Sequence, residues 1–155
     1  MPDLGAIATL EAHGVEPGWV WREVQLRALV ITGETSYMAY ATKDDTVGAE
    51  APPSLKMTRY GFFEFAIPVE TGTRRVTVKA KQVLPPTPRP KMVVKANPAI
   101  GIAADVETTA PSGSDWVTVG PTSFAVSAPG TVQVQLWCLA PGTAVECWFD
   151  DITTT

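Results

Sequence analysis

The chain of 155 residues has little charge, one histidine, two cysteines and no long apolar run. Only 18% of its residues are charged, which argues against a mainly helical protein because surface helices carry many lysines and glutamates. A net charge of -4 argues against nucleic acid, which attracts clustered Lys and Arg. A membrane helix needs about 20 apolar residues. The longest uncharged stretch, residues 116–145, offers no such span because it is interrupted by Pro121, Pro129, Gly130, Pro141 and Gly142.

The composition and the pattern of apolar residues favour an all-β domain. Hydrophobic residues make up 45% of the chain, and its 14 prolines and 12 glycines separate short runs that alternate between apolar and polar residues. We expect residues 1–22 to form an N-terminal arm or first strand and residues 23–155 to form a single domain, because domains span about 100 to 200 residues. The pattern of short strands is typical of a β-sandwich or barrel. Strands are predicted over residues 23–32, 54–58, 62–68, 75–81, 92–96, 116–119, 123–126, 131–138 and 146–152.

Three segments are predicted to lie outside the strands. Residues 84–90 contain four prolines, which lack the amide donor that a sheet requires, so we expect an exposed loop. Residues 33–53 and 97–115 have no sustained alternation and are predicted as long loops.

Cys138 and Cys147 are the only cysteines, and they flank a Pro-Gly turn. If the flanking strands pair, the two side chains come within range of a hairpin disulfide. The alternative is two buried free thiols, since cysteine is often buried in either oxidation state. Zinc is not expected, because a site needs about four ligands and His13 is the only histidine.

The order of several short motifs resembles the carbohydrate-binding-module-like jelly-roll domains, which are galactose-binding-like β-sandwiches. The motifs are ATLE at 8–11, GW at 18–19, PSLKMT at 53–58, FAIPV at 65–69, Trp116, VQVQL at 132–136 after Gly130, and FDDI at 149–152. The resemblance implies a two-sheet antiparallel β-sandwich of the jelly-roll type, often with a structural calcium. The calcium ligands would be Glu11 and Asp150 or Asp151. Alternatively, Asp150 and Asp151 bind no metal and only end the last strand, where they cap loop amides or face water.

No motif indicates catalysis. His13 has no GxSxG nucleophile motif to partner it, and it reads as a solvated loop residue. The paired carboxylates Asp44-Asp45 and Asp150-Asp151 are neighbours in sequence, so on a strand they point to opposite faces and cannot flank one glycosidic bond. We therefore expect a protein that is not an enzyme.

The last two strands are predicted to form a hairpin around residues 141–144, with Trp137 opposite Trp148. If Val132 and Val134 face the core, the residues that alternate with them form one outward strip of indoles, amides and a carboxylate. Such a strip can bind a sugar by ring stacking and hydrogen bonds, form a protein interface, or be covered as a second core. Its residues are Gln133, Gln135, Trp137, Trp148 and Asp150.

Two functional hypotheses follow. The N-terminus lacks the charge pattern of a secretory leader, and we find no flexible linker to a catalytic domain, so we expect a structural protein of a virion surface. It would be a phage capsid decoration or tail component that packs on neighbouring subunits as a homo-oligomer or against capsid and tail proteins. The alternative is an extracellular carbohydrate-binding module that recognises a glycan through surface tryptophans.

Overall fold

In the computed structural model, residues 41–44, 46–49, 54–58, 60–140 and 144–155 are described. The predicted arm at 1–22 and the predicted strand at 23–32 lie outside these ranges, as do Glu11, His13 and Asp45. No helix among the described residues is long and apolar enough to cross a membrane.

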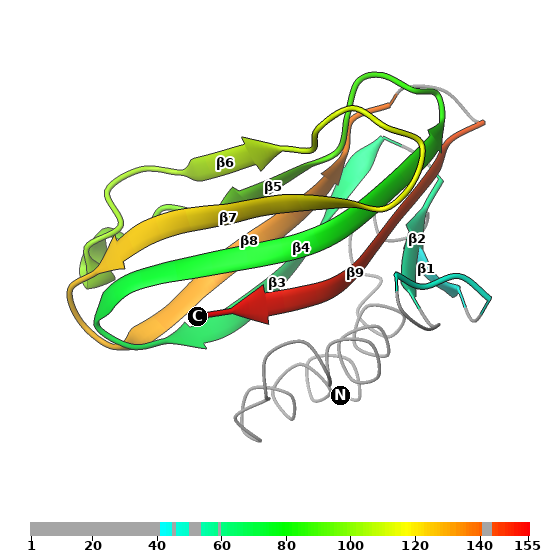
Figure 1. Ribbon diagram of the computed structural model, residues 1–155. Helices are drawn as coiled ribbons and strands as arrows, with labels where there is room; N and C mark the ends of the chain where they lie inside the picture. Colours follow the sequence, from blue (N-terminus) through cyan, green and yellow to red (C-terminus); the bar gives the residue numbers. More distant parts are fainter. Residues whose placement is uncertain (1–40, 45, 50–53, 59, 141–143) are drawn as a thin grey trace.

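The described residues form nine strands in two antiparallel sheets that stack face to face (Figure 1). The first sheet has the order β1-β2-β9-β4-β7, and the second has the order β3-β8-β5-β6. The first sheet contains β1 (Ala41–Asp44), β2 (Ser54–Met57), β9 (Glu146–Thr154), β4 (Gly72–Leu84) and β7 (Val117–Val126), and the second contains β3 (Gly61–Val69), β8 (Gly130–Cys138), β5 (Lys91–Val94) and β6 (Val106–Thr109).

The connectivity is that of a jelly roll, which confirms the predicted fold class. Strands β2 to β9 supply four strands to each sheet, and most consecutive strands switch from one sheet to the other. Strand β1 adds an edge beside β2. Because β8 and β9 are among the strands that switch sheets, the predicted hairpin between them is wrong, and Trp137 does not lie opposite Trp148.

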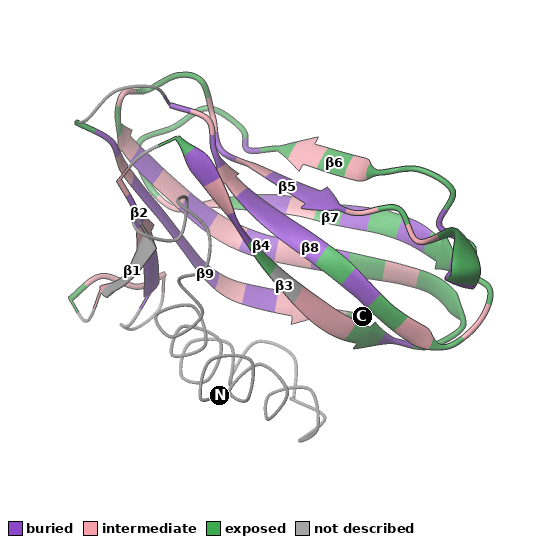
Figure 2. Cartoon of the chain, turned by 180° about the vertical axis from the view of Figure 1, so that it is seen from behind, coloured by how far each residue is buried: buried purple, intermediate pink, exposed green. Residues whose placement is uncertain are grey.

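Alternation along each strand places one face of each sheet in the core. In β4, Val76, Val78 and Ala80 are fully buried, while Lys79 and Lys81, which alternate with them, are half-buried, as the sequence predicted. Figure 2 shows the same alternation of buried and exposed residues along the central strands. The largest fully buried apolar side chains are Phe63, Phe149, Leu55, Met57, Met92 and Leu136.

Strand β7 joins two segments that the sequence analysis separated, at 116–119 and 123–126. The register between β4 and β7 shifts at Val76/Val78, where Gly120 approaches the partner strand. Gly120 has a φ of +106°, and a Cβ at this position would lie 2.8 Å from the carbonyl oxygen of Val76. A glycine therefore lets the strand continue through Pro121 rather than end there.

The two predicted long loops contain short elements, so these predictions were partly wrong. Strand β1 lies within 33–53, and β6 together with a 3-10 turn, η3 (Pro98–Ile100), lies within 97–115. Both strands have only four residues and stand at sheet edges, so too little alternation is present to identify them from sequence.

The proline-rich segment after Leu84 is a loop, as predicted, and buried side chains hold it. The amide nitrogen of Gln82, which is fully buried, donates to the carbonyl oxygens of Pro85 at 2.7 Å and Pro88 at 2.8 Å. Arg89 donates to the carbonyl of Pro111 at 2.9 Å, which ties the loop to the segment before β7.

The packing of Phe149 gives a test of the core. This ring is fully buried in the central strand β9, and its neighbours in the sheet are Leu55 and Ala80. We expect Phe149→Ala to lower the free energy of unfolding by about 3 to 5 kcal/mol in urea denaturation, because a buried cavity replaces the ring. The exposed Thr118→Ala should change it by less than about 0.5 kcal/mol. Equal effects of the two substitutions would contradict this sandwich.

Candidate functional site

The outer side of the second sheet carries the most varied set of side chains, and we call it the β8 face. Because β8 reads VQVQLW, its valines and Leu136 point into the core and its intervening residues point outward. Register places Phe62 of β3 beside Trp137, and Lys91 of β5 on the other side of Trp137. The next row contains Glu64 and Gln135. The β8 face consists of Tyr60, Phe62, Glu64, Lys91, Lys95, Asp105, Glu107, Gln133, Gln135 and Trp137.

Three aromatic rings gather at one end of this face. The ring centroids of Phe62 and Trp137 are 4.6 Å apart with an interplanar angle of 35°. Tyr60 meets Trp137 edge-on, with centroids 6.1 Å apart. Tyr60 is 51% exposed, which is high for a large side chain and makes its ring the most accessible of the three.

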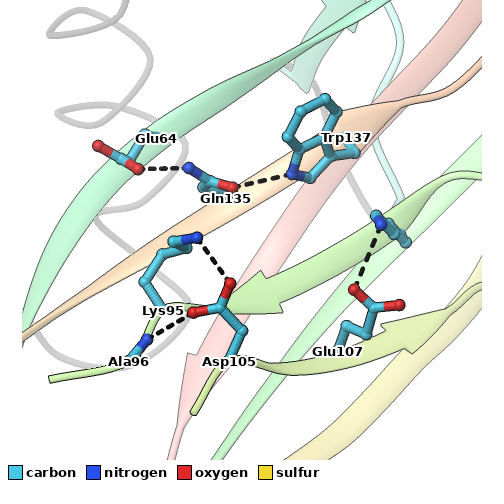
Figure 3. A network of polar contacts seen from close by, with 8 residues as sticks. Glu64, Lys95, Ala96, Asp105, Glu107, Gln135 and Trp137 are labelled. Carbon is cyan, nitrogen blue, oxygen red and sulfur yellow. Dashed lines mark hydrogen bonds and ion pairs between the residues drawn. The ribbon is translucent and has the colours of Figure 1, made fainter. Parts of the chain in front are cut away.

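A chain of hydrogen bonds fixes the orientation of Trp137 (Figure 3). Its indole Nε1 donates to Oε1 of Gln135 at 2.9 Å, and Nε2 of Gln135 donates to Oε2 of Glu64 at 2.6 Å. Gln135 is only 8% exposed, so its amide is held between the indole and the carboxylate. The indole N–H is satisfied internally, and the outer carboxylate oxygen of Glu64 stays exposed.

Two lysines complete the β8 face, each paired with a carboxylate. Nζ of Lys91 lies 3.3 Å from Glu107 and 5.7 Å from the centroid of the Trp137 ring. Nζ of Lys95 lies 2.7 Å from Asp105, which also accepts a hydrogen bond from the backbone N–H of Ala96 (Figure 3). The hydrogen bond from Lys95 and then that from Ala96 lower the pKa of Asp105, whose side chain is well exposed.

The predicted strip is divided between the two sheets. Gln133, Gln135 and Trp137 share the β8 face, with Gln133 exposed. Trp148 and Asp150 lie in β9, on the outer side of the first sheet, and both are buried. The three β8 residues therefore belong to one surface, and the two β9 residues belong to another.

Trp148 sits in a separate polar setting. Its indole Nε1 donates to Oδ2 of Asp44 at 2.9 Å, and the amines of Lys56 and Lys81 lie 5.1 and 5.8 Å from the ring centroid. The side chain is only 6% exposed, so this indole offers little surface to a ligand. Cation–π contacts and the hydrogen bond give Trp148 a structural role.

Asp150 was a predicted calcium ligand together with Glu11 and Asp151. Its two carboxylate oxygens accept hydrogen bonds from the backbone N–H groups of Ala49 and Asp151, each at 2.8 Å. Calcium takes about six to eight oxygen ligands, and within the described ranges no group of three or more acidic, histidine or cysteine residues is placed to hold a metal. A calcium site formed by Glu11 with Asp150 or Asp151 stays a prediction, because Glu11 lies outside the described ranges.

Cys138 and Cys147 face each other across the core from opposite sheets, both fully buried. No disulfide joins them in this structure. The hydrogen bond from Cys147 lowers the pKa of Cys138, and burial raises the pKa of Cys147. The hairpin geometry proposed for their disulfide is wrong, because β8 and β9 do not pair, and the disulfide itself stays a prediction.

Sequence reasoning missed the contribution of β3 to this surface. Tyr60, Phe62 and Glu64 lie on the β8 face only because β3 pairs with β8, and these strands are separated by more than 60 residues. The alternation of residues 62–68 predicted that Glu64 points away from the core, which is confirmed by its exposure. Nothing local identified which strand would lie beside it.

Comparison with known proteins finds similar structures but no similar sequence. No protein-family model and no curated protein sequence matches the chain. Among solved structures, it is similar to a family 61 carbohydrate-binding module in complex with β-1,4-galactotriose, at 14% identity and a TM-score of 0.45, covering 74% of this chain and 86% of the module. It is similar to a family 36 module in complex with calcium and xylotriose, at 14% identity and a TM-score of 0.46, covering 75% and 88%.

A family 4 carbohydrate-binding module is similar at 24% identity and a TM-score of 0.47, covering 79% of this chain and 81% of the module. The similar structures are carbohydrate-binding modules with a β-sandwich fold, the kind of domain that the order of sequence motifs resembles. At these identities the likeness concerns the fold alone.

Gln135 provides a test of the hydrogen-bonded chain. We expect Gln135→Ala to lower the free energy of unfolding by about 1 to 3 kcal/mol, because the indole of Trp137 loses its acceptor in a largely buried setting. In an NMR spectrum the indole N–H signal of Trp137, assigned with Trp137→Phe, should shift. The exposed Gln133→Ala should leave both the stability and this signal unchanged. An unshifted signal in Gln135→Ala would contradict the contact.

Asp44 gives a pH dependence with a defined sign. Burial raises the pKa of Asp44, but hydrogen bonds from Trp148 and Thr46, with the charge of Lys56, lower it more, so the pKa lies below its ordinary value. The stabilisation is therefore complete above the unfolded pKa of about 3.9 and is lost as the pH falls through the folded pKa. We expect Asp44→Asn to be less stable than wild type at neutral pH and equally stable in strong acid.

Denaturation midpoints measured across this pH range check the expectation for Asp44. The indole N–H signal of Trp148 should titrate with the Asp44 carboxylate in wild type and should lose that titration in Asp44→Asn. Asp115→Asn is the matched control, because Asp115 is exposed and contacts only its neighbour Trp116 among the described residues. A stability difference that persists unchanged into strong acid would show that Asp44 acts through something other than its charge.

Proposed function

We propose that the protein is a glycan-binding module and that the β8 face is its binding surface. The observation that carries the proposal is an exposed Tyr60 beside Trp137, whose indole is held by a buried amide next to an exposed carboxylate. Aromatic rings pack against the apolar C–H face of a pyranose, while carboxylates and amides pair with its hydroxyls. The β8 face supplies both kinds of group within neighbouring rows of two strands.

The rigidity of this arrangement supports binding. The internal hydrogen bonds of Trp137 and Gln135 fix these side chains before a ligand arrives, so less conformational entropy is lost on association. Outward groups beyond this pair remain available, including Gln133 and the second oxygen of Glu64, which are exposed. A glycan of a few residues can therefore use the aromatic end for stacking and the polar rows for hydrogen bonds.

A glycan-binding role corresponds to the alternative that the sequence analysis gave, acting outside the cell and without catalysis. No contact among the described residues favours the virion hypothesis, the homo-oligomer or the capsid and tail partners. The tryptophans that the sequence analysis paired divide in role: Trp137 belongs to the proposed surface, and Trp148 is excluded from it by its burial.

Titration calorimetry with β-1,4-galactotriose and xylohexaose, and affinity gels containing galactan and xylan, test the proposal. We expect saturable binding to at least one of these glycans. Tyr60→Ala and Trp137→Ala should each weaken it by about tenfold, the effect of losing one stacked ring. Unfolding curves show whether each variant is folded.

Leu84→Ala is the matched control, because Leu84 is 49% exposed and lies in the first sheet, away from the β8 face. It should bind as wild type does. Binding that survives the loss of both rings, or is weakened equally by Leu84→Ala, would place the site elsewhere and refute the proposal.

A further inference from the structure

The charges on the β8 face are unevenly paired. Its three carboxylates outnumber its two lysines, and each lysine already has a carboxylate partner, Lys91 with Glu107 and Lys95 with Asp105. Glu64 is left with a neutral partner, the amide of Gln135. Its carboxylate is exposed and stands next to the aromatic cluster along β3. This end of the face therefore carries an uncompensated negative charge beside aromatic rings.

The outer side of the first sheet carries charges of both signs. Lys56, Lys79 and Lys81 point outward from β2 and β4, where two of them flank Trp148. Asp44, which accepts the hydrogen bond from that indole, and Asp150 lie on the same side. The local charge of Glu64, rather than a charge difference between the two outer sides, is therefore what attracts a cationic ligand.

Lys91 shows how an ammonium group fits on this surface. Its Nζ lies 5.7 Å from the centroid of the Trp137 ring and 3.3 Å from Glu107, so it is held between a π face and a carboxylate. On the other side of Trp137, Glu64 stands in the row next to Phe62, about 13 Å along β3 from Tyr60. Its hydrogen-bond partner is the neutral amide of Gln135, and no ion pair joins it to a lysine or arginine among the described residues. Ammonium groups bind well between aromatic faces and carboxylates.

From this arrangement, and resting on the proposed function, we propose that the β8 face prefers glycans that carry a free amino group, with Glu64 receiving the ammonium while the ring of Tyr60 stacks on another sugar of the same chain. The ligand class is an oligosaccharide of glucosamine. A neutral sugar gains the stacking contacts and hydrogen bonds without the ion pair, and a uronic acid oligosaccharide is repelled by Glu64. Glu64 is the residue that determines this specificity.

Calorimetry at mildly acidic pH, where sugar amines are protonated, tests this preference. The probes are a glucosamine oligosaccharide, its fully N-acetylated form of equal length, and a galacturonate oligosaccharide. We expect the free-amine form to bind about fivefold more tightly than the acetylated form at low salt, with the uronate weakest. High salt should reduce the ratio toward one, because the extra attraction is between exposed charges.

Glu64→Gln should bring the ratio between the free-amine and acetylated forms to near one, because the charge is lost while a glutamine oxygen still accepts the hydrogen bond from Gln135. Any loss of hydrogen bonds to sugar hydroxyls should weaken both forms alike and leave the ratio near one. Glu70→Gln is the matched control: it removes the same charge from an exposed residue just beyond the far end of β3 and should keep the preference. A ratio near one in wild type, or a ratio unchanged in Glu64→Gln, overturns the inference.

Two further outcomes separate this inference from the function on which it rests. If the acetylated form binds and depends on Tyr60 but the amine adds nothing, the glycan-binding function stands and the specificity falls. If a lysine oligomer binds as tightly as the glucosamine oligosaccharide, the face recognises charge without the sugar, and the inference is refuted. If none of the glycans, including galactotriose and xylohexaose, binds, the proposed function fails as well.

Discussion

Strand β8 is the constraint on which the rest of the arrangement depends. It lies in the middle of the second sheet, and its inward residues Val132, Val134 and Leu136 are almost completely buried. Because side chains alternate along a strand, burying these three fixes Gln133, Gln135 and Trp137 on the outside. A shift of one residue would bury two glutamines and expose the valines, so packing of the core holds the β8 face in register.

Strand β8 pairs with β3 on one side and with β5 on the other, and the three strands together form the β8 face. Strand β3 adds an aromatic ring and a carboxylate opposite Trp137 and Gln135, and β5 adds Lys91. The two pairings bring together residues that are far apart in the sequence. The hydrogen bond from the amide of Gln135 to Glu64 depends on the register between β8 and β3, whereas that from the indole of Trp137 to Gln135 lies within β8.

The fold class and most of the strands could be predicted from the sequence. When one face of a strand is buried, apolar residues recur at every second position, as in the segment RVTVKAK. Short edge strands such as β1 and β6 were missed, since four residues with mixed polarity carry little pattern. The site was predicted in part. The outward direction of Gln133, Gln135 and Trp137 follows from alternation, but the strands beside them depend on the topology. Because β9 follows β8 in the sequence, we predicted that the two strands pair, and they lie in different sheets.

Trp137 and Trp148 show why residue type alone does not define a binding site. Each indole N–H has an acceptor close by, Gln135 for one and Asp44 for the other, and each ring has a lysine over it. The difference lies in what surrounds them: Trp148 is nearly sealed and flanked by two lysines, whereas Trp137 lies close to an exposed tyrosine and to a carboxylate whose partner is a neutral amide. Exposure and uncompensated charge, rather than the indole, therefore distinguish a surface that can receive a ligand from one that only stabilises the fold.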